Sequence, residues 1–144
     1  KGFTESAELF GRLLRMFDAL QKKKMHVILL SHVGIRTFND PEREPYDRWE
    51  MSTHKKVSAM IREWVDFNLF ANYEVSTRTS GQGFKETTRA VSYGKRKLFH
   101  KYTAAFDAKS RVDLGVAPLD LDWTAFMTAF KQSLKSKKEG EKNV

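Results

Sequence analysis

Two short polar motifs in this chain could carry phosphate chemistry. The first is Ser31-His32, which ends an apolar run that begins at Met25. The second is Ala108-Lys109-Ser110-Arg111, a β-like run in which a lysine and an arginine lie two residues apart. Side chains at this spacing on an extended segment point to the same side, so Lys109 and Arg111 can reach one anion. Because ligands of open α/β sheets sit at the carboxyl ends of strands, Ser31 and His32 are expected at such an edge.

Composition limits the classes of protein to which the chain can belong. With 144 residues, of which 40% are hydrophobic, it is long enough for one domain with a core. A net charge of +8 favours a polyanionic partner such as nucleic acid, although a merely basic surface is an equal alternative. The absence of cysteine excludes disulfides, thiolate catalysis and zinc ribbons. No apolar run is long enough to span a membrane and no signal peptide is evident, so we expect a cytoplasmic protein without a membrane partner.

The elements that position Ser31 and His32 are predicted as a helix followed by a strand. Apolar residues recur at three- and four-residue steps over residues 4–23, which is typical of an amphipathic helix. Residues 25–30 form a continuous apolar run, typical of a strand that is covered on both faces in a parallel sheet. The pair resembles the second half of a β-α-β unit.

Residues 34–52 are polar and interrupted by two prolines, and we predict a long surface loop. The loop carries Arg36, Arg43 and Arg48 interleaved with aromatic residues. Cations beside flat apolar side chains are what single-stranded nucleic acid requires, because its phosphates need charge and its unstacked bases need stacking surfaces. An ordinary solvated loop is the alternative, since its acidic residues cancel the local charge.

The later part of the chain is predicted to be rich in β-structure. A short helix begins after His54 with Lys55 and Lys56 in its first turn, and a basic antiparallel meander follows over residues 67–107. Asp122 is the expected N-cap of a last helix. We divide the chain into a domain of residues 1–134 and a charged flexible tail of residues 135–144. The fold class is α/β, with a mixed sheet whose parallel strands precede the meander.

This order of elements and motifs resembles the C-terminal portion of a RecA-like P-loop NTPase core. It looks most similar to phage-encoded AAA-type nucleotide-binding proteins that act as single-strand annealing recombinases. Ser31-His32 and Lys109-Ser110-Arg111 are the most specific pieces of the resemblance, which extends from about residue 2 to about residue 130.

The resemblance implies a role for each candidate residue. His32, with Ser31, would sense the γ-phosphate of ATP and couple it to a DNA-binding loop, which would hold Arg36, Arg43 and Arg48 with Lys55 and Lys56 following it. Lys109 and Arg111 would act as catalytic cations on the nucleotide of a neighbouring subunit. The implied cofactors are ATP and Mg²⁺, and the implied partners are single-stranded DNA and further copies of the chain in a ring or filament. A phage-encoded protein of this kind would act in the cytoplasm of a bacterial host.

One departure from the resemblance bears on catalysis. The phosphate loop G-x-x-x-x-G-K-[ST] is absent, and Gly81-Gln82-Gly83-Phe84-Lys85 has the wrong spacing. Because the chain begins at Lys1 without an initiator Met, we expect that a preceding segment supplies this loop and most of the ATP and Mg²⁺ contacts. An ATPase active only in the longer protein is therefore one hypothesis. A non-catalytic nucleic-acid-binding module with a basic surface is the other, and a structural phage component is a weaker third.

Overall fold

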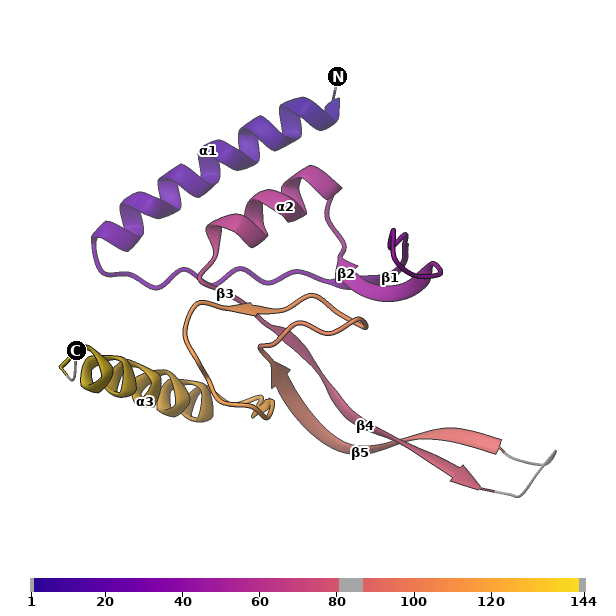
Figure 1. Ribbon diagram of the computed structural model, residues 1–144. Helices are drawn as coiled ribbons and strands as arrows, with labels where there is room; N and C mark the ends of the chain where they lie inside the picture. Colours follow the sequence, from indigo (N-terminus) through magenta and orange to yellow (C-terminus); the bar gives the residue numbers. More distant parts are fainter. Residues whose placement is uncertain (1, 81–86, 143–144) are drawn as a thin grey trace. The chain divides into compact units, whose positions relative to one another are not determined.

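The computed structural model describes residues 2–80 and 87–142 of the chain (Figure 1). The chain divides into two compact units. Unit 1 comprises Lys1–Asp66 and Thr103–Asp107, and unit 2 comprises Phe67–Tyr102 and Ala108–Val144.

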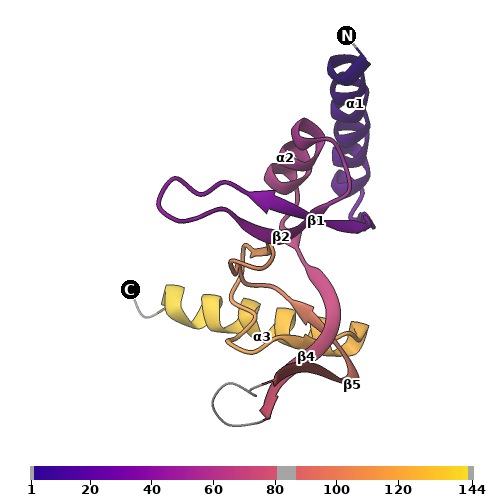
Figure 2. The same cartoon turned by 90° about the vertical axis from the view of Figure 1, so that its right-hand side faces the viewer.

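Two helices packed side by side form the core of unit 1. They are α1 (Gly2–Lys22) and α2 (Lys55–Trp64), and both ribbon views show them adjacent (Figures 1 and 2). Leu14 of α1 is buried, as are Val57 and Ile61 of α2. Gly11 lets the helices approach closely, because a Cβ at this position would lie 3.1 Å from the Met60 side chain. The predicted first helix and the predicted helix after His54 are confirmed.

A β-hairpin follows where the sequence predicts a loop. Strand β1 (Val33–Phe38) pairs antiparallel with β2 (Tyr46–Met51), and Ile35 lies opposite Trp49. Exposed and half-buried residues alternate along β1, as expected for a strand with one solvated face. Both prolines lie in the connection between the strands, where they do not interrupt the ladder. The prediction of an irregular loop over residues 34–52 is therefore wrong, because only the connection is irregular.

The prediction of a buried strand over residues 25–30 is also wrong. These residues belong to no strand, and Ile28 and Leu30 are 67% and 95% exposed. The backbone changes direction just before them, at Lys24, which has a φ of 62°. A strand requires a hydrogen-bonded neighbour, and within residues 2–80 and 87–142 the structure pairs none with this segment. The apolar composition alone could not supply that neighbour.

Unit 2 is built on a long antiparallel pair. Strand β4 (Phe70–Ser80) pairs with β5 (Thr87–Phe99), and β7 (Leu119–Asp120) adds to the other edge of β5. The predicted antiparallel meander is confirmed in this part. Gly94, with a φ of 71°, lies within β5 at the point where its register with β4 shifts.

The remaining elements of unit 2 pack around aromatic side chains. Strand β3 (Phe67–Asn68) pairs antiparallel with β6 (Lys109–Ser110). The ring of Phe67 meets Phe126 and Phe130 of α3 (Trp123–Lys142) edge to face, with centroids 5.4 and 5.7 Å apart. The Asp122 carboxylate accepts a hydrogen bond from the Ala125 N–H at 2.8 Å, which confirms the predicted N-cap. Helix α3 extends to Lys142 and so includes most of the predicted tail, whose flexibility stays a prediction.

The sheets of the described residues are small, and every pair of named strands is antiparallel. The structure is a mixed arrangement of helices and small sheets. The parallel strands predicted for a RecA-like sheet do not appear in it. None of the described helices is long and apolar enough to cross a membrane.

Candidate phosphate-binding sites

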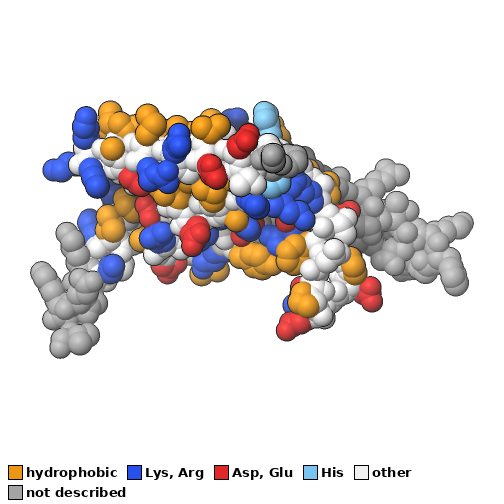
Figure 3. All heavy atoms as spheres, turned by 90° about the horizontal axis from the view of Figure 1, so that it is seen from above, with side chains coloured by type: hydrophobic (Ala, Val, Ile, Leu, Met, Phe, Trp, Pro, Cys, Tyr) orange, Lys and Arg blue, Asp and Glu red, His pale blue; other side chains and the backbone are white. Residues whose placement is uncertain are grey.

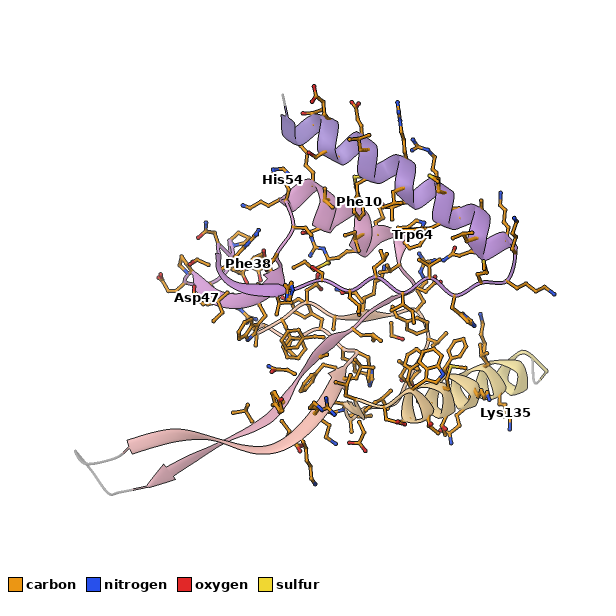
Figure 4. The ribbon with its side chains drawn as sticks, turned by 180° about the vertical axis from the view of Figure 1, so that it is seen from behind. Phe10, Phe38, Asp47, His54, Trp64 and Lys135 are labelled. Carbon is orange, nitrogen blue, oxygen red and sulfur yellow. The ribbon has the colours of Figure 1, made fainter. Side chains whose placement is uncertain are left out.

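Three of the predicted DNA-binding cations converge at the start of α2 in unit 1. The Arg36 guanidinium donates a hydrogen bond from Nη2 to the Thr53 carbonyl at 3.4 Å, directly before the N-cap residue His54. Lys55 and Lys56 are the first two residues of α2, and both are exposed. Figure 4 shows His54 at this end of the helix. We call Arg36, Lys55 and Lys56 the α2 cation cluster.

The electrostatics of this helix end favour an anion. The N-terminus of a helix carries a partial positive charge, which acidic side chains usually offset. The first turn of α2 contains no acidic residue and two lysines instead. The Nδ1 atom of His54 accepts a hydrogen bond from the Lys56 N–H at 3.4 Å, and this side chain brings no negative charge to the cap. A bound phosphate would offset charge that the helix itself leaves uncompensated.

The other two arginines of the hairpin have different surroundings. Arg48 is buried, with its guanidinium carbon 4.9 Å from the Phe38 ring centroid and its Nε 3.9 Å from the Glu50 carboxylate. This environment is that of a packing residue. Arg43 is exposed in the connection between β1 and β2, where its N–H donates to the Asp40 carbonyl at 3.4 Å.

The aromatic residues of the hairpin pack locally. The rings of Phe38 and Tyr46 lie side by side, with centroids 5.7 Å apart, and Figure 4 shows Phe38 on the hairpin near Asp47. The Asp47 carboxylate accepts a hydrogen bond from the Thr37 hydroxyl at 2.8 Å. These contacts agree with the alternative that the sequence left open, in which aromatic and acidic side chains of this segment serve its own structure.

Ser31 and His32 lie at the entry to the hairpin, not at the end of a buried strand. Both residues are exposed. The Ser31 hydroxyl donates to the His32 carbonyl at 2.9 Å, and the same carbonyl accepts the Ser52 N–H at 2.8 Å. The backbone of His32 therefore closes the base of the hairpin while its imidazole faces solvent.

Lys109 and Arg111 lie in unit 2 and differ in their surroundings. Lys109 is half-buried in β6, opposite Asn68 of β3. Arg111 is exposed and lines a cavity of about 440 Å³ between residues 111–115 and α3, whereas Lys109 does not line it. That both cations reach one anion stays a prediction, as does a catalytic role for either residue.

The chain's own residues fit ATP and Mg²⁺ only in part. Arg111 and the exposed His32 could contact phosphate oxygens, but the sequence contains no phosphate loop. Gly81-Gln82-Gly83-Phe84-Lys85 lies outside the described residues. No group of three or more His, Asp or Glu side chains in the described part of the chain could hold a metal ion.

Sequence reasoning missed the polar face of α3 and a buried histidine. Ser133 and Lys137 line the cavity beside Arg111, and their four-residue spacing was a usable signal because it places them on one helix face. His100 is 3% exposed, and its Nε2 lies 3.0 Å from the Ala117 carbonyl. Nothing in the sequence distinguishes this buried histidine from an exposed one.

The comparison with known proteins supports an AAA-type assignment. The family described as AAA domain matches residues 1–112, which is most of the chain. The searches of curated proteins and of solved structures found no match to this chain. The chain therefore belongs to the AAA domain family, and this membership points to a nucleotide-binding function of the ATPase type.

Proposed function

We propose that this chain is part of an ATP-dependent, single-stranded-DNA-binding protein that acts in recombination or annealing. In this proposal unit 1 contacts the DNA backbone, and ATP is held between copies of the protein in a ring or filament. Family membership supports the nucleotide-binding part of the proposal. The α2 cation cluster is the observation that supports the nucleic-acid part.

The α2 cation cluster suits phosphate because its charges meet a helix end. Arg36 contributes a planar fork of donors that can hold two phosphate oxygens. Lys55 and Lys56 add exposed point charges on the helix that begins beside it. Such a surface binds the backbone without reading sequence, which is what an annealing protein requires.

The experiment measures binding of a fluorescent oligothymidylate to the purified chain across a range of salt concentrations. The triple variant Arg36→Ala, Lys55→Ala, Lys56→Ala should lower the log–log salt slope by about 2, since each lost contact to a single strand removes about 0.7. The contribution of these phosphate contacts to binding vanishes near 1 M salt. A slope that is lower by about 2 therefore means that the affinity of the variant is roughly a hundredfold lower at 0.1 M salt.

A matched control removes three exposed cations from α1 instead. Arg12, Arg15 and Lys22 are all exposed, and their replacement by Ala changes the net charge equally. If this control loses as much affinity as the α2 triple variant, general basicity explains the binding. If the α2 triple variant binds as tightly as the wild type, the proposed interface is wrong.

The proposed catalytic cations are tested separately in the full-length protein. We propose that Lys109 and Arg111 act on the nucleotide of a neighbouring subunit. His32, in the Ser31-His32 motif, senses the γ-phosphate of ATP. Lys109→Ala or Arg111→Ala should then lower ATP turnover by roughly 10³-fold, the low end of the effect of an arginine finger. Unchanged turnover in both variants would remove this role.

A second candidate function is a non-catalytic nucleic-acid-binding module. The absence of a phosphate loop from these residues favours it. DNA binding that depends on the α2 cation cluster, together with full-length protein that shows no ATP turnover, would select this candidate.

A further inference from the structure

The cavity of unit 2 is formed by one loop and one helix. Residues 111–115 supply one wall, and α3 supplies the other through Ala129, Gln132, Ser133, Ser136 and Lys137. The spacing of these helix residues by three and four places them on a single face. We call the cavity the Arg111–Lys137 groove. Its helical wall lies beyond residues 1–112, the part of the chain that the AAA domain family covers.

The polar groups of the groove are suited to an oxyanion. Arg111 enters from the loop and Lys137 from the helix, so positive charge comes from both walls. Ser133 adds a hydroxyl group that can donate to a phosphate oxygen, whereas the Ser136 hydroxyl donates to the Gln132 carbonyl at 3.2 Å. Among the described residues of the lining the acidic side chain is Asp113, which accepts a hydrogen bond from the Gly115 N–H at 3.0 Å on one oxygen of its carboxylate.

The groove also has an apolar part. Leu114 is 5% exposed, and Val112 and Ala129 are half-buried beside it. A volume of about 440 Å³ falls within the range of small-molecule sites. An apolar floor beside two cations matches a ligand with a flat body and an anionic end.

We propose that the Arg111–Lys137 groove binds a phosphate-bearing ligand of about the size of one nucleotide. The phosphate lies between Arg111 and Lys137, and the apolar body rests on Leu114 and Ala129. The ligand is either a free nucleotide or one nucleotide unit of a single strand, since both present the same chemistry. The inference does not rest on the DNA interface of unit 1, because every residue that it uses lies in unit 2. It shares Arg111 with the proposed catalytic role, so Lys137→Gln, which alters the groove alone, distinguishes the two.

The test is a titration of the isotope-labelled chain followed by NMR. The probes are ATP, adenosine, and an oligothymidylate without terminal phosphates. We expect ATP or the oligothymidylate to shift the amide signals of residues 111–115 and 129–137, and adenosine to bind at least tenfold more weakly than ATP if ATP is the ligand. The probe that shifts these signals identifies the source of the phosphate.

Substitutions on each wall assign the contacts. Arg111→Gln and Lys137→Gln should each weaken binding of the active probe roughly tenfold or more, as expected for loss of a charge-assisted hydrogen bond. Lys137 is exposed on α3, so its replacement should leave the fold intact. Lys135→Gln is the matched control, because Lys135, labelled in Figure 4, is an exposed lysine of the same helix that does not line the groove.

Two results would overturn the proposal. One is the absence of shifts in the groove with both phosphate-bearing probes. The other is binding by Lys137→Gln as tight as by the wild type, or a loss in Lys135→Gln equal to that in Lys137→Gln. The α2 triple variant should retain the shifts of residues 129–137 with ATP, so failure of the interface in unit 1 would not be confused with failure here.

Discussion

The hydrogen bond between Trp64 and Asp18 should be a measurable link between the two helices of unit 1. The Trp64 indole donates from Nε1 to the Asp18 carboxylate at 2.7 Å, across 46 positions of sequence. Figure 4 shows Trp64 on α2 on the side of α1. The Trp64 ring also packs near Phe17, with centroids 6.1 Å apart. Trp64→Phe keeps most of this packing and removes the donor.

The size of the effect follows from the partners of the bond. A hydrogen bond to a charged group contributes roughly 1.5–3 kcal/mol when well shielded. Both residues are only partly buried, which places the expected coupling at or just below the lower end of this range, at about 1–1.5 kcal/mol. Trp64→Phe alone should destabilise the protein somewhat more than this, because the smaller ring also loses apolar area.

The assay is a double-mutant cycle by urea denaturation, with Trp64→Phe, Asp18→Ala and the double variant. Trp123→Phe serves as the control, since Trp123 is 56% exposed at the start of α3. Its replacement should change the free energy of unfolding by less than about 0.5 kcal/mol. If the free-energy changes of the two single variants add to within about 0.3 kcal/mol in the double variant, the hydrogen bond is not a stabilising link between the helices.

Three further predictions concern other elements. Asp120→Asn should remove a stabilising ion pair, in which Lys97 Nζ lies 2.8 Å from the Asp120 carboxylate. The hydrogen bond and charge of Lys97 lower the pKa of the Asp120 carboxyl, and the hydrogen bond to Asp120 raises the pKa of Lys97. The wild-type advantage over this variant should therefore be present at neutral pH and disappear as pH falls through the lowered pKa, and urea denaturation at several pH values checks this. Gly94→Ala should cost about 1 kcal/mol in thermal unfolding, since Gly94 has a φ of 71° and an added Cβ meets nothing within 4 Å, so that only backbone strain acts. Leu14→Ala should destabilise by roughly 2–5 kcal/mol, whereas Leu9→Ala, at a position 64% exposed, should cost far less; equal losses would contradict the assigned inner face of α1.

The outer face of α1 marks one limit of the periodicity argument. The apolar pattern of this helix predicts one buried face that includes Leu9, Leu13 and Leu20, yet Leu9 is 64% exposed and the other two are 37% exposed. Figure 3, seen from above Figure 1 with α1 toward the viewer, shows hydrophobic and basic side chains side by side on this surface. Periodicity identifies the helix, whereas only the neighbours of a helix determine how much of its apolar stripe is covered.

Local features of the structure were determined by the sequence itself. Helix periodicity predicted α1, Asp122 predicted the start of α3, and the strand and turn residues of 67–107 predicted an antiparallel meander, in which β4 pairs with β5. These signals depend on hydrogen bonds and side-chain spacing within a few residues of the chain. They therefore do not depend on which other elements pack nearby. The clustering of positive charge was likewise readable, because charge does not depend on the fold.

Tertiary structure alone decided which of the predicted site residues meet. Arg36 joins Lys55 and Lys56 because the hairpin returns its chain to the start of α2, while Arg48 of the same hairpin turns inward against Phe38. The register of β1 with β2 places Arg36 directly opposite Arg48, so both side chains lie on the same face of the hairpin. Only the neighbours that each guanidinium meets, the Thr53 carbonyl for Arg36 and the Phe38 ring for Arg48, distinguish the two. The apolar residues 25–30 show the same principle, since they have the composition of a strand but lack a neighbour with which to form one. Pairing partners distant in sequence leave no local signal, and for this reason the Arg111–Lys137 groove could be found only in the folded chain.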